Sequence, residues 1–137
     1  RSTRKESSAA SDVYKRQGND GGSLISVLTL DMSTAGKATF NNDVVAYSDR
    51  KLKENIKTLD GKKVLEMRGV SFDRIDTGLP SSGVIAQEMQ EVAPELVSET
   101  NGTLGVSYGN LVGYLIEAVK DQQKQINELK EIVNGGS

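Results

Sequence analysis

The chain has 137 residues, with 17 basic and 19 acidic side chains and a formal net charge of −2 at neutral pH. Apolar residues make up 36% and aromatic residues 4%, so a monomer of this length would have a thin core that oligomerisation could supplement. The absence of cysteine and histidine excludes disulfides, cysteine-based metal sites and a Ser-His-Asp triad. The mixed charge and the lack of a long apolar run predict neither a nucleic-acid partner nor a membrane partner.

The first third of the chain predicts a leader and a β-rich stalk. Residues 1–22 are polar and rich in glycine and serine, which favours a disordered leader, either a natural linker or a translated sequencing-adapter remnant (8–17). Residues 23–47 then predict the end of a β-rich stalk. Within it, residues 23–30 form a short β-rich run, and residues 38–47 have a strand-turn-strand pattern.

A more highly charged region begins at Ser48 and predicts a small α+β domain. Residues 48–60 suit a helix or an irregular strand, because their apolar residues have spacings of four and three. Further signals along the region are a short helix over 62–67, a strand over 70–75, a small buried strand over 83–86, and a helix over 87–92 that Pro94 ends.

Residues 97–106 predict a β-hairpin. Asn101-Gly102 is a two-residue turn signal between the two candidate strands. With Thr103 it also forms a formal glycosylation sequon, but no secretion signal accompanies it, and the turn is the favoured reading.

The last segment, residues 108–134, predicts a long helix with a coiled-coil seam. Its apolar residues alternate at spacings of four and three, a 3.5-residue period that favours association with other helices. The seam consists of Tyr108, Val112, Leu115, Val119, Gln122, Ile126, Leu129 and Val133. Its mixture of β-branched and leucine residues leaves the number of helices open. The alternative is a single helix that packs on its own domain.

Three motifs occur in order along the chain: residues 48–56 (SDRKLKENI), residues 83–88 (GVIAQE) with 94–97 (PELV), and residues 106–108 (VSY) followed by Leu111. Together they resemble the intramolecular chaperone domain of phage tail fibres and tailspikes, peptidase family S74. The resemblance covers residues 47–133.

This resemblance implies an α+β fold: a small mixed domain over residues 48–107 and a long C-terminal helix over residues 108–134 that forms a trimeric coiled coil, preceded by a short β-stalk segment. It also implies a homotrimer whose folding client is the upstream tail-fibre stalk. Such a chain would be assembled in the host cytoplasm and would function in the virion tail.

The resemblance further implies autoproteolysis between Tyr47 and Ser48, once per chain and without metal or organic cofactor. Ser48 would be the nucleophile and Lys53 its base. A lysine accepts a proton only when neutral, and burial or a nearby positive charge favours the neutral form. Asp49 and Glu88 are candidate supporting residues. Asp49 would orient Lys53 or cap a helix, and Glu88 has a favourable place near a helix N-terminus.

The spacing of the implied dyad raises a geometric question. Ser48 and Lys53 are five positions apart, and neither a helix nor a strand brings side chains at that spacing together. We therefore expect the chain to bend between them, or Lys53 to come from a neighbouring subunit. Lys51, three positions from Ser48, is the competing base.

Three rival functions remain at this point. A purely structural trimerisation foot would not cut itself. A receptor-binding tip would recognise a host surface, although the low aromatic content argues against a carbohydrate site. A eukaryotic regulatory version of the same module is disfavoured by the fibre-like stretch before Ser48.

Overall fold

The computed structural model describes residues 13–136, which divide into two compact units. The first unit contains the described residues as far as Lys53, together with Arg74–Leu79. The second contains Glu54–Asp73 and the described residues from Pro80 onward. No helix among residues 13–136 is long and apolar enough to cross a membrane.

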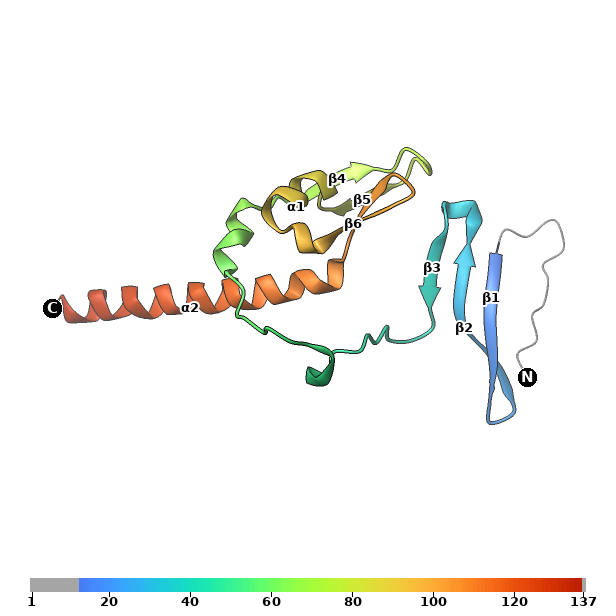
Figure 1. The fold of residues 1–137 in the computed structure, drawn as a ribbon, viewed down its shortest axis with the longest axis horizontal. Coiled ribbons are helices and arrows are strands. Elements are labelled where there is room, and N and C mark those ends of the chain that lie inside the picture. The colour runs from blue at the N-terminus through green and yellow to red at the C-terminus, as the bar shows by residue number, and fades with distance from the viewer. Residues whose placement is uncertain (1–12, 137) are drawn as a thin grey trace. The chain divides into compact units, whose positions relative to one another are not determined.

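The first unit contains a three-stranded antiparallel sheet in the order β1-β2-β3, drawn in blue to cyan in Figure 1. The strands are β1 (Val13–Asp20), β2 (Ser23–Asp31) and β3 (Lys37–Phe40). The two-residue turn Gly21-Gly22 joins β1 to β2, and both glycines have positive φ angles, 59° and 99°. Such φ angles suit glycine, because a β-carbon makes this region unfavourable.

Strand β1 corrects the prediction of a disordered leader. Over Val13–Asp20 the chain pairs with β2 along its whole length, whereas residues 1–12 lie outside the described residues. The side chains of this strand that are described are mostly exposed, so backbone pairing rather than an apolar pattern defines it. Gly-Gly is a recognised hairpin signal, and it would have indicated the strand.

The predicted strand-turn-strand pattern over residues 38–47 is only half correct. Strand β3 ends at Phe40, and residues 43–49 belong to no helix or strand. The last backbone bond toward β2 is donated by the Asn41 N–H to the Val27 carbonyl at 3.1 Å. β-Branched residues such as Val44 and Val45 favour a strand only where a neighbouring strand supplies pairing.

The second unit combines short helices with two hairpins and one long helix. Its elements are η3 (Gly61–Glu66), β4 (Val70–Asp73), β5 (Pro80–Gly83), α1 (Ala86–Val92), η4 (Pro94–Leu96), β6 (Val97–Thr100), β7 (Thr103–Val106), η5 (Tyr108–Asn110) and α2 (Leu111–Gly135). The η elements are 3-10 helices.

Several sequence predictions for this unit are confirmed. The hairpin β6–β7 turns at Asn101-Gly102, whose φ angles are 50° and 74°, and α1 ends before Pro94. The small strand expected over residues 83–86 is displaced instead. It lies at Pro80–Gly83, because β4 pairs there and leaves Val84 and Ile85 as a half-buried approach to α1.

The core of the second unit is small, as composition predicts. Its buried side chains are Met89, Ala93, Leu96 and Tyr114, which come from α1, the residue between α1 and η4, η4 itself and α2. Partly buried apolar residues surround them: Val64, Met67, Val84, Val97 and Leu111. A core of this size supplies limited stability, which leaves room for stabilisation by association.

The first turns of α2 pack against the same unit. Gly61 lies so close to α2 that a β-carbon placed on it would be 2.3 Å from the Ala118 backbone nitrogen. Gly113 likewise faces the Leu59 side chain. From residue 122 to residue 135 every residue of α2 is exposed. The helix therefore has a packed first half and a second half whose residues are exposed.

Candidate functional site

A short turn after the β-sheet brings the candidate dyad together. Asp49 precedes the 3-10 helix η2 (Arg50–Leu52), and its carboxylate accepts a hydrogen bond from the Lys51 N–H at 2.9 Å. Two backbone bonds complete the turn, one from the Leu52 N–H to the Asp49 carbonyl at 3.1 Å and one from the Lys53 N–H to the Arg50 carbonyl at 3.0 Å.

Ser48 and Lys53 meet across this turn within one chain. The Lys53 ammonium donates a hydrogen bond to the Ser48 hydroxyl, with 2.5 Å between Nζ and Oγ. Asp49 and Lys53 both have extended backbone angles, on either side of the 3-10 helix. A turn of about three residues flanked by extended residues reverses the chain, which a continuous helix or strand would not do at this spacing.

Lys51, the competing base, points elsewhere. Its Nζ lies 3.6 Å from the Asp49 carboxylate, in an ion pair whose two side chains are largely exposed. Of the two lysines considered from sequence, the described structure therefore pairs Lys53 with the Ser48 hydroxyl.

The candidate dyad and its neighbours are open to solvent. Tyr47 is 96% exposed, and Ser48 and Lys53 are also exposed. Lys53 acts as the donor in this contact, whereas a general base must first be neutral and accept the hydroxyl proton. The geometry of a dyad is present in the single chain, but the burial that favours a neutral lysine is not.

Glu88 forms an ion pair within the second unit. Its carboxylate accepts hydrogen bonds from the Arg68 guanidinium, which lowers the pKa of Glu88 and raises that of Arg68. The pair joins the first turn of α1 to the segment after η3. This partner gives Glu88 a structural role that the sequence did not suggest.

The predicted seam divides into two parts. Tyr108 lies in η5, before α2 begins, and its hydroxyl accepts a hydrogen bond from the Val84 N–H at 3.2 Å. Tyr108 thus contacts its own domain. The other seam positions lie on α2, where the apolar ones form a stripe that is 45–75% exposed: Val112, Leu115, Val119, Ile126, Leu129 and Val133. Gln122 is exposed within the same stripe.

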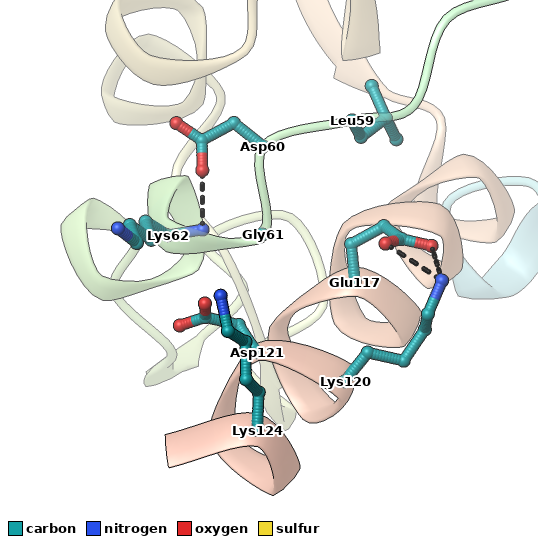
Figure 2. Close-up of a pocket in the computed structure, with 8 residues that line it drawn as sticks. All are labelled: Leu59, Asp60, Gly61, Lys62, Glu117, Lys120, Asp121 and Lys124. Carbon is teal, nitrogen blue, oxygen red and sulfur yellow. Dashed lines mark hydrogen bonds and ion pairs between the residues drawn. The ribbon is translucent and has the colours of Figure 1, made fainter. Parts of the chain in front are cut away.

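A charged groove lies where η3 meets α2, and Figure 2 shows its lining. Its volume is about 350 Å³, and its lining residues are Leu59, Asp60, Gly61, Lys62, Glu117, Lys120, Asp121 and Lys124. The Asp60 carboxylate accepts a bond from the Lys62 N–H, and Lys120 pairs with Glu117.

These lining residues come from two segments about 60 positions apart, and no sequence motif predicted the groove. Three lysines and three carboxylates balance in charge, so the groove favours neither an anion nor a cation. Among the residues that the structure describes, no three acidic side chains lie close enough together to hold a metal ion.

Comparison with known proteins gives one family match and several similar chains. Residues 48–98 match the sequence profile of the family described as chaperone of endosialidase, peptidase family S74. The match begins at Ser48, the residue whose hydroxyl receives the Lys53 contact.

The similar chains are phage tail-fibre proteins. The chain is 33% identical over 110 residues to the long tail fiber protein Gp37 of Salmonella phage S16, covering 70% of this chain and 15% of that protein. It is 34% identical to the Gp37 of Enterobacteria phage K3, covering 64% and 8%, and 32% identical to that of Enterobacteria phage M1, covering 65% and 41%. The chain thus spans less than half the length of each of these relatives.

Proposed function

Because residues 48–98 match the chaperone-of-endosialidase family, we propose that this chain is the intramolecular chaperone segment of a phage tail fibre. In this proposal three copies associate through α2, align the upstream stalk while it folds, and then separate from it by cleavage between Tyr47 and Ser48. The observation that carries the cleavage step is the contact of Lys53 Nζ with Ser48 Oγ at 2.5 Å.

In the proposed reaction Ser48 takes two parts. Its Oγ is the nucleophile, and its backbone nitrogen is the leaving group. Neutral Lys53 takes the proton from Ser48 Oγ, which attacks the carbonyl carbon of Tyr47. The bond from that carbon to the Ser48 nitrogen breaks, and the nitrogen receives the proton. The Tyr47 acyl group is then held as an ester on Ser48 Oγ, and water hydrolyses it to a Tyr47 carboxylate and a free Ser48 hydroxyl.

Association provides a reason for cleavage to wait for assembly. In the single chain Lys53 is exposed to solvent. Burial of the turn by neighbouring copies would favour the neutral lysine that the reaction needs. The stripe on α2 supports such association, because its apolar residues have a 3.5-residue period and remain 45–75% exposed.

A removable chaperone suits the folding problem of a fibre. A stalk of three chains must bring segments of separate molecules into register, which is slow and prone to misassembly. Association through α2 would hold the three chains at high local concentration and align one end of the stalk. Cleavage afterwards would remove the nucleus for unfolding, so the stalk would remain kinetically trapped.

The alternative is a structural trimerisation or receptor-binding tip that does not cut itself. The exposure of the Ser48–Lys53 turn favours it, because the single chain does not bury the turn, and burial is what would favour a neutral lysine. The two functions share the α2 stripe and differ only in what happens at Tyr47–Ser48.

Intact mass spectrometry of the purified chain tests the proposal, beside Ser48→Ala and Lys53→Ala variants. We expect the parent to give one fragment ending at Tyr47 and one beginning at Ser48, and both variants to remain whole. Sedimentation velocity on the same samples should show trimers. A whole parent chain that is trimeric would support the structural tip instead.

A further inference from the structure

We propose that Asp49 is a positioning residue for self-cleavage, because it caps the turn that carries Lys53 to Ser48. The inference deepens the proposed function and rests on it. None of the Asp49 contacts described above involves the Tyr47–Ser48 peptide bond that would break. Its effect would come through the backbone of residues 50–53.

The hydrogen bonds of the turn converge on Asp49. Its side-chain oxygen accepts from the Lys51 N–H at 2.9 Å, and its carbonyl accepts from the Leu52 N–H at 3.1 Å. The other backbone bond of the turn runs from the Lys53 N–H to the Arg50 carbonyl at 3.0 Å. The side-chain bond satisfies an N–H that has no carbonyl partner at the start of a helix.

Within the single chain, packing does not hold the turn in place before copies associate. Every residue from 48 to 60 is exposed, and η2 contains no buried residue. Local hydrogen bonds therefore decide how often the turn is formed. When the turn opens, five positions of extended or helical chain place Ser48 and Lys53 on different faces. The fraction of chains with a formed turn would then scale the rate of cleavage.

The capping bond, and not the charge of Asp49, is the feature that matters here. The ion pair of Asp49 with Lys51 is 3.6 Å long, and its side chains are 53% and 78% exposed. Exposed pairs of this kind contribute little. A cap requires a short side chain with an acceptor oxygen, so asparagine or serine can replace aspartate, whereas alanine cannot.

Cleavage kinetics of the full chain give the first test. The chain is synthesised in a cell-free system with labelled methionine, synthesis is stopped, and loss of uncut chain is followed between pH 6 and pH 9. We expect Asp49→Ala to cleave about fivefold more slowly, within a range of about two- to thirtyfold, and Asp49→Asn to stay within about twofold of the parent. The pH profile should keep its midpoint in both variants.

Glu54→Ala serves as the matched control, because it removes an exposed carboxylate outside the turn. We expect it to cleave like the parent. Equal rates for Asp49→Ala and the parent would overturn the inference. Equal slowing by Asp49→Ala and Asp49→Asn, or a shifted pH midpoint in Asp49→Asn, would assign the effect to charge and would also overturn it.

A second measurement tests the capping role of Asp49 independently of self-cleavage. In the Ser48→Ala chain, NMR couplings and amide–amide contacts of residues 50–52 report whether the turn is formed, without any need for cleavage. We expect these signals in Ser48→Ala and in Ser48→Ala with Asp49→Asn, and their loss with Asp49→Ala. Retention with Asp49→Ala would refute the capping role. A parent chain that never cuts would refute only the proposed cleavage.

Discussion

The Tyr114 hydroxyl of α2 donates a hydrogen bond to the Glu95 carboxylate of η4. Tyr114 is only 3% exposed and belongs to the core, so the bond connects the long helix to the interior of the second unit. Burial, and then the bond to Glu95, raise the pKa of Tyr114 to about 12. The same bond lowers the pKa of Glu95 below its ordinary value.

These two pKa shifts give stability a dependence on pH at both extremes. The pKa of Tyr114 is higher in the folded chain than its reference value of 10.0. Its contribution to the free energy of unfolding is therefore present below pH 10 and is lost between about pH 10 and pH 12. The pKa of Glu95 is lower in the folded chain, so its contribution is present above its reference value of 4.5 and is lost as pH falls below it.

Tyr114→Phe should therefore destabilise the chain most at intermediate pH. We expect its free energy of unfolding at pH 7 to fall by about 1 to 2 kcal/mol, because a hydrogen bond to a charged group is lost while the ring remains. Urea unfolding at pH 3, 7 and 11.5, in a Ser48→Ala background and at fixed protein concentration, measures this. A difference from the parent that stays constant across all three pH values would contradict the assignment.

The close approach of Gly61 to Ala118 predicts that a larger residue at position 61 destabilises the chain. A methyl group at position 61 would collide with the backbone of α2, and the collision has no flexible side chain to relieve it. We expect Gly61→Ala to lower the free energy of unfolding by about 1 to 3 kcal/mol, and more if α2 separates. Gly69→Ala is the matched control, since a β-carbon there meets nothing within 4 Å. Thermal unfolding that is equal for the two variants would disprove the close approach.

Arginine substitutions separate the two lysines near the proposed cleavage point. We expect Lys53→Arg to abolish self-cleavage, because a guanidinium stays charged and cannot accept the Ser48 proton. Lys51→Arg should cleave at about the parent rate, because Lys51 pairs with Asp49 and not with Ser48. Intact mass spectrometry after expression distinguishes the two. Cleavage by Lys53→Arg at the parent rate would remove Lys53 from the role of base.

If the apolar stripe on α2 is the interface between copies, a charge within it should reduce association. Ile126→Glu places a charge in the stripe, beyond the part of α2 that packs on its own unit, so it should reduce association without unfolding the domain. Lys124→Glu also adds a carboxylate to an exposed part of the helix, but off the stripe, and should associate like the parent. Sedimentation velocity gives the oligomeric state. Unchanged association of Ile126→Glu would show that the stripe is not the interface.

Local signals in the sequence predicted much of the second unit. Asn101-Gly102 marked a hairpin because few residues other than glycine and asparagine adopt positive φ, and Pro94 marked the end of α1. The long helix followed from its 3.5-residue period. Spacing alone places Tyr108 in the seam, whereas its hydroxyl accepts a hydrogen bond from the Val84 N–H, a contact that depends on tertiary structure.

The candidate site was predictable in its residues but not in its geometry. Sequence placed Ser48 and Lys53 together only by resemblance, and spacing argued against both regular elements. The short 3-10 turn brings the two side chains together at this spacing. Its local signal is Asp49, whose side-chain oxygen accepts a hydrogen bond from the N–H of Lys51, two residues later. The partner of Glu88 could not be foreseen, because Arg68 lies 20 positions away and reaches it only in the folded unit.

The segment between the sheet and the turn has one more consequence. Residues 43–49 belong to no helix or strand, and each of their side chains is exposed. Because this junction forms no regular structure and buries no side chain, we expect it to tolerate replacement of the sequence that precedes it. Under the proposed function, exchange of the sequence before this junction would therefore leave the folding of residues 54–136 intact.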